Sequence, residues 1–212
     1  MPVIGAFAVP HPPIIMPEIG RGEERKIAAT DAAFREAARR CAQLKPDVIV
    51  VLSPHSVLYR DYFHISPGRR ARGDFRAFGH PEVKVEADYD AELAAGIAAE
   101  AKKAGIAAGT MGERDAGLDH GTMIPLRYFF GQCGPVPVVR IGLSGFSLLE
   151  HYRFGEAIAR AADSLGRRAV IIASGDLSHK LKADGPYGFV PEGPRFDERV
   201  MDVLARADFG AL

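Results

Sequence analysis

Four histidines in this chain stand where an imidazole could hold a metal ion or carry a proton. His11, His55 and His179 each follow shortly after an apolar run, and His120 follows Asp119 in a glycine-containing stretch. Short apolar runs rich in β-branched residues are typical of strands that are buried on both faces of a sheet. Ligands of α/β proteins usually bind beyond the carboxyl ends of such strands. If the strands are parallel neighbours, we expect the four imidazoles to meet at one edge of the sheet.

The shared position of these histidines favours a function over a structural role. A single histidine after a strand is more often a hydrogen-bonded structural residue than a ligand, but three in the same topological position change that balance. Prolines next to His11 and His55 restrict the backbone and lower the entropy cost of holding both rings in place. For the other histidines we expect a partly exposed strand position for His64 and surface positions for the remaining two, His80 and His151.

Candidate partners of these imidazoles lie close to them in the sequence. Asp119, Asp176 and Ser178 could fix the orientation of a neighbouring histidine by a hydrogen bond. Aspartate is also common in turns and helix caps, and a serine hydroxyl can simply satisfy backbone groups. The sequence leaves both interpretations open for these residues, and also for Ser174.

Alternating strands and helices must position these groups. Buried strands are predicted at residues 3–9, 47–52, 136–142 and 169–173, and helices at 23–44, 88–104, 148–165 and 195–205. Short strands are predicted at 62–66, 83–86 and 105–110, with a surface loop between the first two and another loop at 113–121. Residues 123–130 are apolar and could form a short helix. This order predicts an α/β fold of one domain, residues 1–212, with a central, mostly parallel but mixed sheet flanked by helices.

Composition narrows the class of protein. The chain has 212 residues, of which 47% are hydrophobic and 25% charged, and its formal net charge is +0. This balance offers no general attraction for nucleic acid or a membrane surface. The apolar N-terminal run lacks a basic leader and soon reaches prolines, so we expect a cytoplasmic protein.

Four separated motifs resemble those of a known family. They are VPHPP at 9–13, SPH at 53–55, LDHGTMIPL at 118–126 and SGDLSH at 174–179. Together they are similar to the class III extradiol ring-cleavage dioxygenase catalytic subunit (LigB-like) superfamily. The likeness is greatest to the LigB-type domain of AmmeMemoRadiSam system proteins and extends more distantly to MEMO.

The resemblance implies an oxidoreductase of aromatic compound catabolism. A non-haem Fe(II) would be held by His11 and His55, and the enzyme would cleave a catechol-type aromatic substrate with O2. His179 corresponds to the acid–base catalytic histidine and His120 to a second catalytic histidine. The family's carboxylate ligand lies beyond the position that matches His179. We expect it after Leu212, so that the chain is truncated at its C-terminus.

Other functions remain open on the sequence alone. A MEMO-like protein would bind iron or copper without cleaving rings, and a zinc-dependent hydrolase would also use histidines, a carboxylate and an open position. The expected partners are a small aromatic substrate and O2, without nucleic acid or membrane. A homo-oligomer, or an additional domain or subunit, is also compatible with the resemblance.

Overall fold

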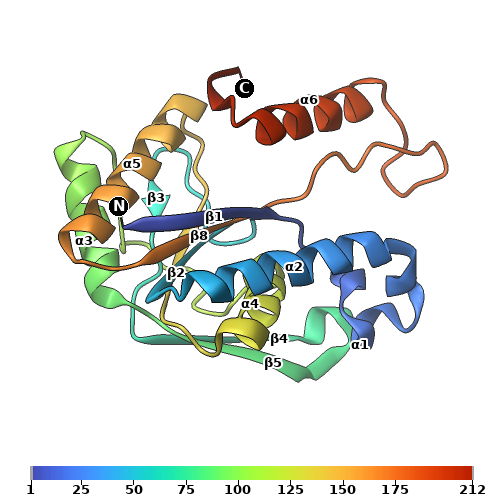
Figure 1. Ribbon diagram of the computed structural model, residues 1–212, viewed down its shortest axis with the longest axis horizontal. Coiled ribbons are helices and arrows are strands. Elements are labelled where there is room, and N and C mark those ends of the chain that lie inside the picture. The colour runs from blue at the N-terminus through green and yellow to red at the C-terminus, as the bar shows by residue number, and fades with distance from the viewer. Residues whose placement is uncertain (1, 212) are drawn as a thin grey trace. The chain divides into compact units, whose positions relative to one another are not determined.

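The computed structural model describes residues 2–211 in two compact units, the first ending at Gly175 and the second beginning at Asp176. The first unit contains the central sheet and the helices that cover it (Figure 1). The second contains a loop and a C-terminal helix.

The central sheet has four parallel strands in the order β1-β8-β2-β7. Their bounds are Val3–Val9 for β1, Val48–Ser53 for β2, Val138–Gly142 for β7 and Ala169–Ser174 for β8. The last strand in the chain therefore lies between the first two. This arrangement confirms the predicted α/β class, and each strand lies within two residues of its predicted start.

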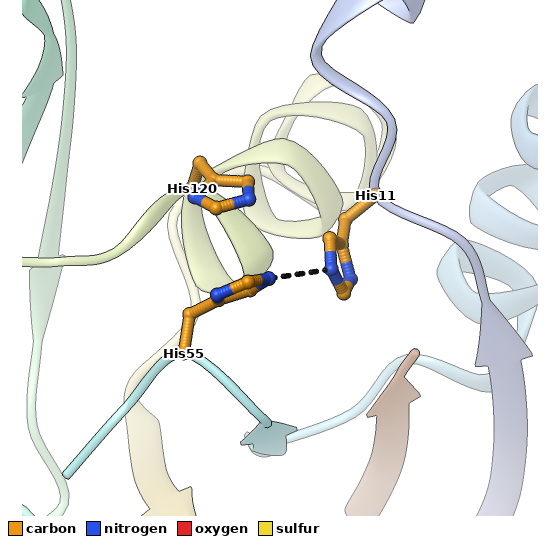
Figure 2. Close-up of side chains that lie close together, drawn as sticks. All are labelled: His11, His55 and His120. Atoms are coloured by element: carbon orange, nitrogen blue, oxygen red, sulfur yellow. Dashed lines mark hydrogen bonds between the residues drawn. The ribbon is translucent and has the colours of Figure 1, made fainter. Parts of the chain in front are cut away.

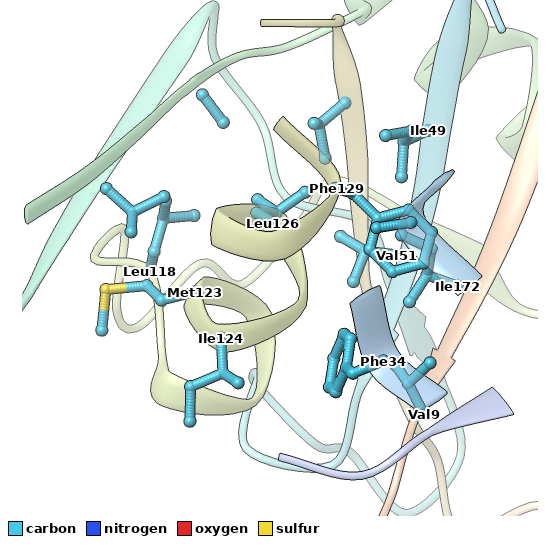
Figure 3. Packing of buried hydrophobic residues seen from close by; sticks show 14 of the residues in the cluster. Val9, Phe34, Ile49, Val51, Leu118, Met123, Ile124, Leu126, Phe129 and Ile172 are labelled. Atoms are coloured by element: carbon cyan, nitrogen blue, oxygen red, sulfur yellow. The ribbon is translucent and has the colours of Figure 1, made fainter. Parts of the chain in front are cut away.

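The two faces of the sheet pack into two separate cores. In β2, Ile49 and Val51 join one core while Val48 and Val50 join the other, as expected for side chains that alternate along a strand. Helices α2 (Ala28–Leu44) and α4 (His120–Cys133) cover the first face, and α3 (Ala91–Lys103) and α5 (Leu148–Ser164) the second. Figure 3 shows the first core, where the aromatic ring of Phe129 packs beside Val51 and Ile172.

One prediction about the first face was wrong. The stretch 67–82, expected to be a surface loop, forms β4 (Arg70–Phe75), the 3-10 turn η3 (Arg76–Phe78) and the beginning of β5 (His80–Asp88). β4 and β5 form an antiparallel pair, and β5 contains the strand predicted at 83–86. The pair is stabilised because Val83, Val85 and Ala87 alternate towards the core while the residues between them face solvent. The short strands β3 (Phe63–His64) and β6 (Ala108–Gly109) pair in parallel, within the predicted segments.

The remaining helices are shorter or earlier than predicted. The predicted helix 23–44 divides into the 3-10 segment η2 (Glu23–Ile27) and α2, after the small turns η1 (Pro13–Ile15) and α1 (Pro17–Gly20). Helix α4 starts at His120, inside the segment predicted to be a loop. In the second unit, α6 (Glu192–Arg206) precedes the 3-10 turn η4 (Phe209–Ala211). Over residues 2–211, no helix combines the length and apolar character needed to span a bilayer.

Candidate metal centre

Three histidines from distant parts of the sequence converge in the first unit. His11 lies two residues beyond β1, His55 two residues beyond β2, and His120 is the first residue of α4. Figure 2 shows the three rings together, at the ends of the strands and the start of the helix. The sequence predicted this convergence from the carboxyl ends of the strands, although it placed His120 in a loop rather than in a helix.

The three rings lie close enough to share an ion. His55 Nε2 is 3.0 Å from His11 Nε2, and one ligand atom from each of the three residues lies within 4.8 Å of the others. Metal–imidazole bonds are about 2.0–2.1 Å, so one ion can contact two nitrogens separated by less than twice that length. His11 is buried while His55 is exposed, so an ion held between them would be open to solvent and small ligands.

The chemistry of this donor set fits a transition metal. Imidazole nitrogens are ligands for Fe, Cu and Zn, whereas Mg²⁺ and Ca²⁺ prefer oxygen. Among the residues that the structure describes, the group holds no carboxylate or thiolate. The donor set alone therefore does not select one metal from the three.

Asp119 connects the segments that carry two of the histidines. It is the N-cap of α4 and accepts a hydrogen bond of 2.9 Å from the backbone N–H of Thr122 and another of 2.9 Å from the Thr122 hydroxyl. It also accepts from the hydroxyls of Ser53, at 2.6 Å, and Ser56, at 2.8 Å, on either side of His55. A single carboxylate thus fixes the loop after β2 and the start of α4.

The electrostatics of Asp119 match this role. Burial alone would raise the pKa of its carboxyl group, but the hydrogen bonds from Ser53, Ser56 and Thr122 outweigh burial and hold the pKa below its usual value. The positive charge of Arg140 adds to the same effect. Asp119 therefore stays ionised at neutral pH, as a hydrogen-bond acceptor.

A second connection joins His11 to β8. The hydroxyl of Ser174, the last residue of β8, lies 2.8 Å from His11 Nδ1 and donates a hydrogen bond of 2.6 Å to the carbonyl oxygen of Gly121. Ser174 pairs in register with Val9 in β1, which places its side chain beside the residues that follow β1. The sequence left the role of Ser174 open, and only the pairing of β1 with β8 reveals its contacts.

Gly121 lies against the histidines and requires the absence of a side chain. A Cβ atom at this position would lie 2.6 Å from Ser53 Oγ and 3.1 Å from His55 Cδ2. The ring of Phe78 contacts that of His120 edge to face, with centroids 5.3 Å apart. Gly121 belongs to the LDHGTMIPL motif, but the motif does not reveal its close packing against Ser53 and His55, and Phe78 carried no recognisable signal because its contact joins distant segments.

The second unit contains the other predicted site residues. His179 Nε2 lies 3.5 Å from Asp176 Oδ2, and the His179 ring lies 5.1 Å from that of Tyr187, centroid to centroid. Ser178 accepts a hydrogen bond from the backbone N–H of Lys180 and therefore satisfies a turn. The position of this unit relative to the three histidines is not determined, so a catalytic role of His179 stays a prediction.

His64 differs from its prediction. It was expected to be partly exposed, but it is fully buried on β3, next to the buried side chain of Arg140. The flanking residue Phe63 gave no sign that this short strand is covered on both sides. The other two histidines lie outside the cluster. His80 contacts Glu82 at 2.8 Å, and His151 donates to the carbonyl of Ser147, its Nδ1 lying 2.9 Å from that oxygen.

Comparison with known sequences identifies a family whose match includes the three clustered histidines. A family model described as the catalytic LigB subunit of aromatic ring-opening dioxygenase matches residues 5–212. Protein CA_C1420 of Clostridium acetobutylicum is 36% identical over 212 residues, which cover 96% of this chain and 45% of that protein. A 2,3-dihydroxyphenylpropionate/2,3-dihydroxicinnamic acid 1,2-dioxygenase of Rhodococcus sp is 31% identical over 217 residues, covering 95% of this chain and 63% of that enzyme. The chain thus spans less than two thirds of the length of either relative.

Two further comparisons, one with a dioxygenase sequence and one with a solved structure, are consistent with these matches. A 3,4-dihydroxyphenylacetate 2,3-dioxygenase of Escherichia coli is 27% identical over 189 residues, which cover 82% of this chain and 67% of that enzyme. The crystal structure of the uncharacterized protein JW3007 from Escherichia coli K12 superposes with a TM-score of 0.55 at 21% identity. That match covers 80% of this chain and 65% of the other, and it supports the fold alone.

Proposed function

Because the chain belongs to the family of catalytic LigB subunits of aromatic ring-opening dioxygenases, we propose that it carries the metal centre of an extradiol dioxygenase. The proposed reaction is the cleavage of a catechol-type ring with O2. The observation that carries the proposal is the approach of His11 Nε2 to 3.0 Å from His55 Nε2, next to His120.

In this proposal His11 and His55 hold a divalent ion, and Fe(II) is the proposed metal. Bound Fe(II) would supply the oxygen chemistry. Ser174 contacts the imidazole of His11, and Asp119 fixes the loop that carries His55 through the hydroxyls of Ser53 and Ser56. The third ligand stays a prediction, since a carboxylate is expected from the resemblance.

His120 and His179 are proposed to handle protons and the substrate. The ring centroid of His120 lies 4.0 Å from that of His55, so its imidazole can reach a small molecule bound beside the ion. His179 is proposed to accept a proton from a substrate hydroxyl and later to return one. An imidazole can perform both transfers near neutral pH. The role of His179 rests on the sequence resemblance.

The substrate is proposed to be a catechol. Both named dioxygenase relatives act, by their names, on dihydroxyphenyl compounds that carry a carboxylate side chain. Two adjacent hydroxyl groups could bind on the open side of the cluster, where His55 is exposed. The partners proposed with the substrate are O2 and a further domain or subunit, and the proposed location is the cytoplasm.

A zinc hydrolase is a further candidate beside the MEMO-like metal-binding protein, because three imidazoles around an open position are also a catalytic zinc set. The two candidates differ in the oxidant that they need. A hydrolase consumes no O2 and would be active with Zn²⁺, whereas the dioxygenase would consume O2 in step with the loss of catechol.

The experiment is anaerobic purification followed by metal analysis and by O2 uptake with a panel of catechols. We expect one Fe(II) per chain and catechol-dependent O2 uptake that is lost in His55→Ala. The matched control is His151→Ala, a histidine on α5 outside the cluster, which should retain both. Stoichiometric Fe(II) without O2 uptake would favour the MEMO-like metal-binding alternative. Full O2 uptake in His55→Ala would reject the proposed centre.

A further inference from the structure

The first turn of α4 contains a carbonyl group that lacks its usual helical donor. In an α-helix the carbonyl of one residue accepts from the N–H four residues later, so the carbonyl of Gly121 would accept from residue 125. Residue 125 is a proline inside this helix and has no N–H to donate. Since Gly121 is buried, its carbonyl needs a partner from elsewhere in the fold.

Ser174 provides that partner. Its hydroxyl lies at the end of β8, at 2.6 Å from the Gly121 oxygen. A carbonyl oxygen only accepts hydrogen bonds, and a hydroxyl has a single proton to donate. The proton of Ser174 is therefore committed to Gly121.

This commitment determines which nitrogen of His11 is protonated. His11 Nδ1 lies 2.8 Å from the same Ser174 oxygen, which has only lone pairs left to offer. His11 must then donate from Nδ1, and in the neutral ring Nε2 carries a lone pair. The opposite tautomer would leave the buried Gly121 carbonyl without the Ser174 proton, at a cost of about 1–3 kcal/mol. A preference of roughly fivefold to a hundredfold follows, since 1.4 kcal/mol corresponds to a factor of ten.

We propose that Pro125 and Ser174 are positioning residues that hold His11 in the Nδ1–H tautomer and leave its Nε2 lone pair facing His55. That nitrogen is the one 3.0 Å from His55 Nε2, where the ion is proposed to bind. The tautomer follows from the hydrogen bonds alone. Its use as a prepared metal ligand rests on the proposed function, because a ligating nitrogen must present a lone pair.

A tautomer measurement tests the first part. In the metal-free full chain with ¹⁵N-labelled histidine, long-range ¹H–¹⁵N NMR at about pH 8, where an ordinary imidazole is neutral, should show His11 protonated at Nδ1. Ser174→Ala removes the acceptor and should give a mixture of the two tautomers, whereas Ser174→Thr keeps the hydroxyl and should preserve the wild-type spectrum. A dominant Nε2–H form in the wild-type protein would overturn the proposal.

Pro125→Ala tests whether the proline is the reason that the Ser174 hydroxyl donates its proton to the Gly121 carbonyl. This variant restores an N–H to residue 125, which can bond to the Gly121 carbonyl and allow the Ser174 hydroxyl to turn towards His11. We expect a measurable fraction of the Nε2–H form. The helix should fold at least as readily, because alanine is a better helix former than proline. An unchanged His11 spectrum would show that the proline has no part in selecting the tautomer.

Zn²⁺ affinity, measured by titration calorimetry on the same proteins, tests the second part. Ser174→Ala should bind about 10–100-fold more weakly, as is typical when the partner of a ligating histidine is removed. The control is Ser164→Ala, which loses a hydroxyl that donates to the Ala161 carbonyl in α5, away from the site, and should retain full affinity. If the tautomer is as expected but the wild-type protein does not bind Zn²⁺, the proposed metal centre fails and the tautomer assignment stands. If Ser174→Ala changes neither tautomer nor affinity, the inference itself is wrong.

Discussion

His11 and His64 are both buried, yet their surroundings have opposite characters. His11 is 3% exposed, and its ring contacts Ser174 through one nitrogen and His55 through the other. His64 is 0% exposed, and neither of its ring nitrogens has a hydrogen-bond partner within residues 2–211. Burial therefore does not distinguish the proposed ligand His11 from the packed ring of His64, whereas the hydrogen-bond partners of the ring nitrogens do.

The charges around His64 explain why it stays neutral. Its Nε2 lies 4.0 Å from Glu113 Oε2, too far for a hydrogen bond, and Glu113 itself lies 3.4 Å from the buried guanidinium of Arg140. Burial lowers the pKa of His64 below its usual value. The negative charge of Glu113 opposes this shift and the positive charge of Arg140 adds to it. The ring is held as a neutral aromatic group between polar neighbours, without the hydrogen bonds that prepare His11.

The largest expected difference between the two histidines is in metal binding. His11→Ala removes a proposed ligand and should weaken Zn²⁺ or Fe(II) binding by more than about 100-fold, beyond the usual effect of losing an outer partner. His64→Leu should bind the metal as the wild type does. Metal analysis after dialysis, with circular dichroism to verify folding, measures both. Equal metal content in the two variants would contradict the distinction between these histidines.

The next largest effect is expected from Asp119, which has the partners that His64 lacks. Asp119→Ala leaves two serine hydroxyls and the Thr122 groups without their acceptor, and the free energy of unfolding should fall by about 3–4 kcal/mol. The control is Ser147→Ala at the N-cap of α5, where loss of one capping contact should cost about 1 kcal/mol. Urea unfolding compares them. Similar losses would mean that Asp119 acts only as a helix cap.

Gly121→Ala tests how closely the histidine cluster is packed. The new Cβ would meet Ser53 Oγ at 2.6 Å, and overpacking of this kind costs about 1–3 kcal/mol. Gly131→Ala is a matched control in the same helix, where an added Cβ meets nothing within 4 Å. It should stabilise the protein by up to about 1 kcal/mol, since alanine favours helix. Thermal unfolding of the two variants should therefore shift in opposite directions, and a parallel shift would argue against close packing at Gly121.

The smallest expected effect is that of replacing His64 itself. At about pH 8, His64→Leu should raise the free energy of unfolding by about 1 kcal/mol, because two buried nitrogens without partners are replaced by an apolar side chain.

The pH dependence of His64→Leu gives the sign of the pKa shift. Because the pKa of His64 is lowered in the folded state, the unfolded chain binds a proton first as the pH falls. The stability associated with the neutral ring is complete above the unfolded pKa of about 6.5 and is lost below it. Urea unfolding at several pH values should show this loss in the wild type and a smaller loss in His64→Leu. If the free energies of unfolding of the wild type and His64→Leu changed in parallel with pH, the His64 ring would have to be hydrogen-bonded in solution.

The sequence predicted the sheet and the convergence of His11, His55 and His120, because buried parallel strands have a strong and local signal. It predicted the strand at 83–86, which lies within β5, but missed β4 and the beginning of β5. The arginines and glycines of the preceding stretch favoured a loop. The start of α4 was placed too late because the glycines within 113–121 favoured a loop, so a helix was expected only from residue 123. The sequence also left open whether Asp119 caps a helix, which it does.

The supporting contacts of the site could not be predicted in the same way. Ser53 and Ser56 become partners of Asp119 only when the loop after β2 lies beside the start of α4. Ser174 reaches His11 and Gly121 only because β8 lies next to β1. Each contact depends on pairing between segments far apart in the chain, and single residues such as serine carry no distinct signal for it. The burial of His64 depends on packing in the same way.

The position of β8 between β1 and β2 also has a consequence for the order in which the protein assembles during synthesis. β1 leaves the ribosome well before β8, its one neighbour in the sheet among residues 2–211, and Ser174 of β8 follows Val9 by more than a hundred and fifty residues. Such distant pairings raise the contact order and slow folding. His11 can acquire its Ser174 partner only after nearly the whole first unit has been translated. A nascent chain therefore exposes β1 before the contacts of the proposed metal site are complete, so acquisition of metal at that site would report that the first unit has folded.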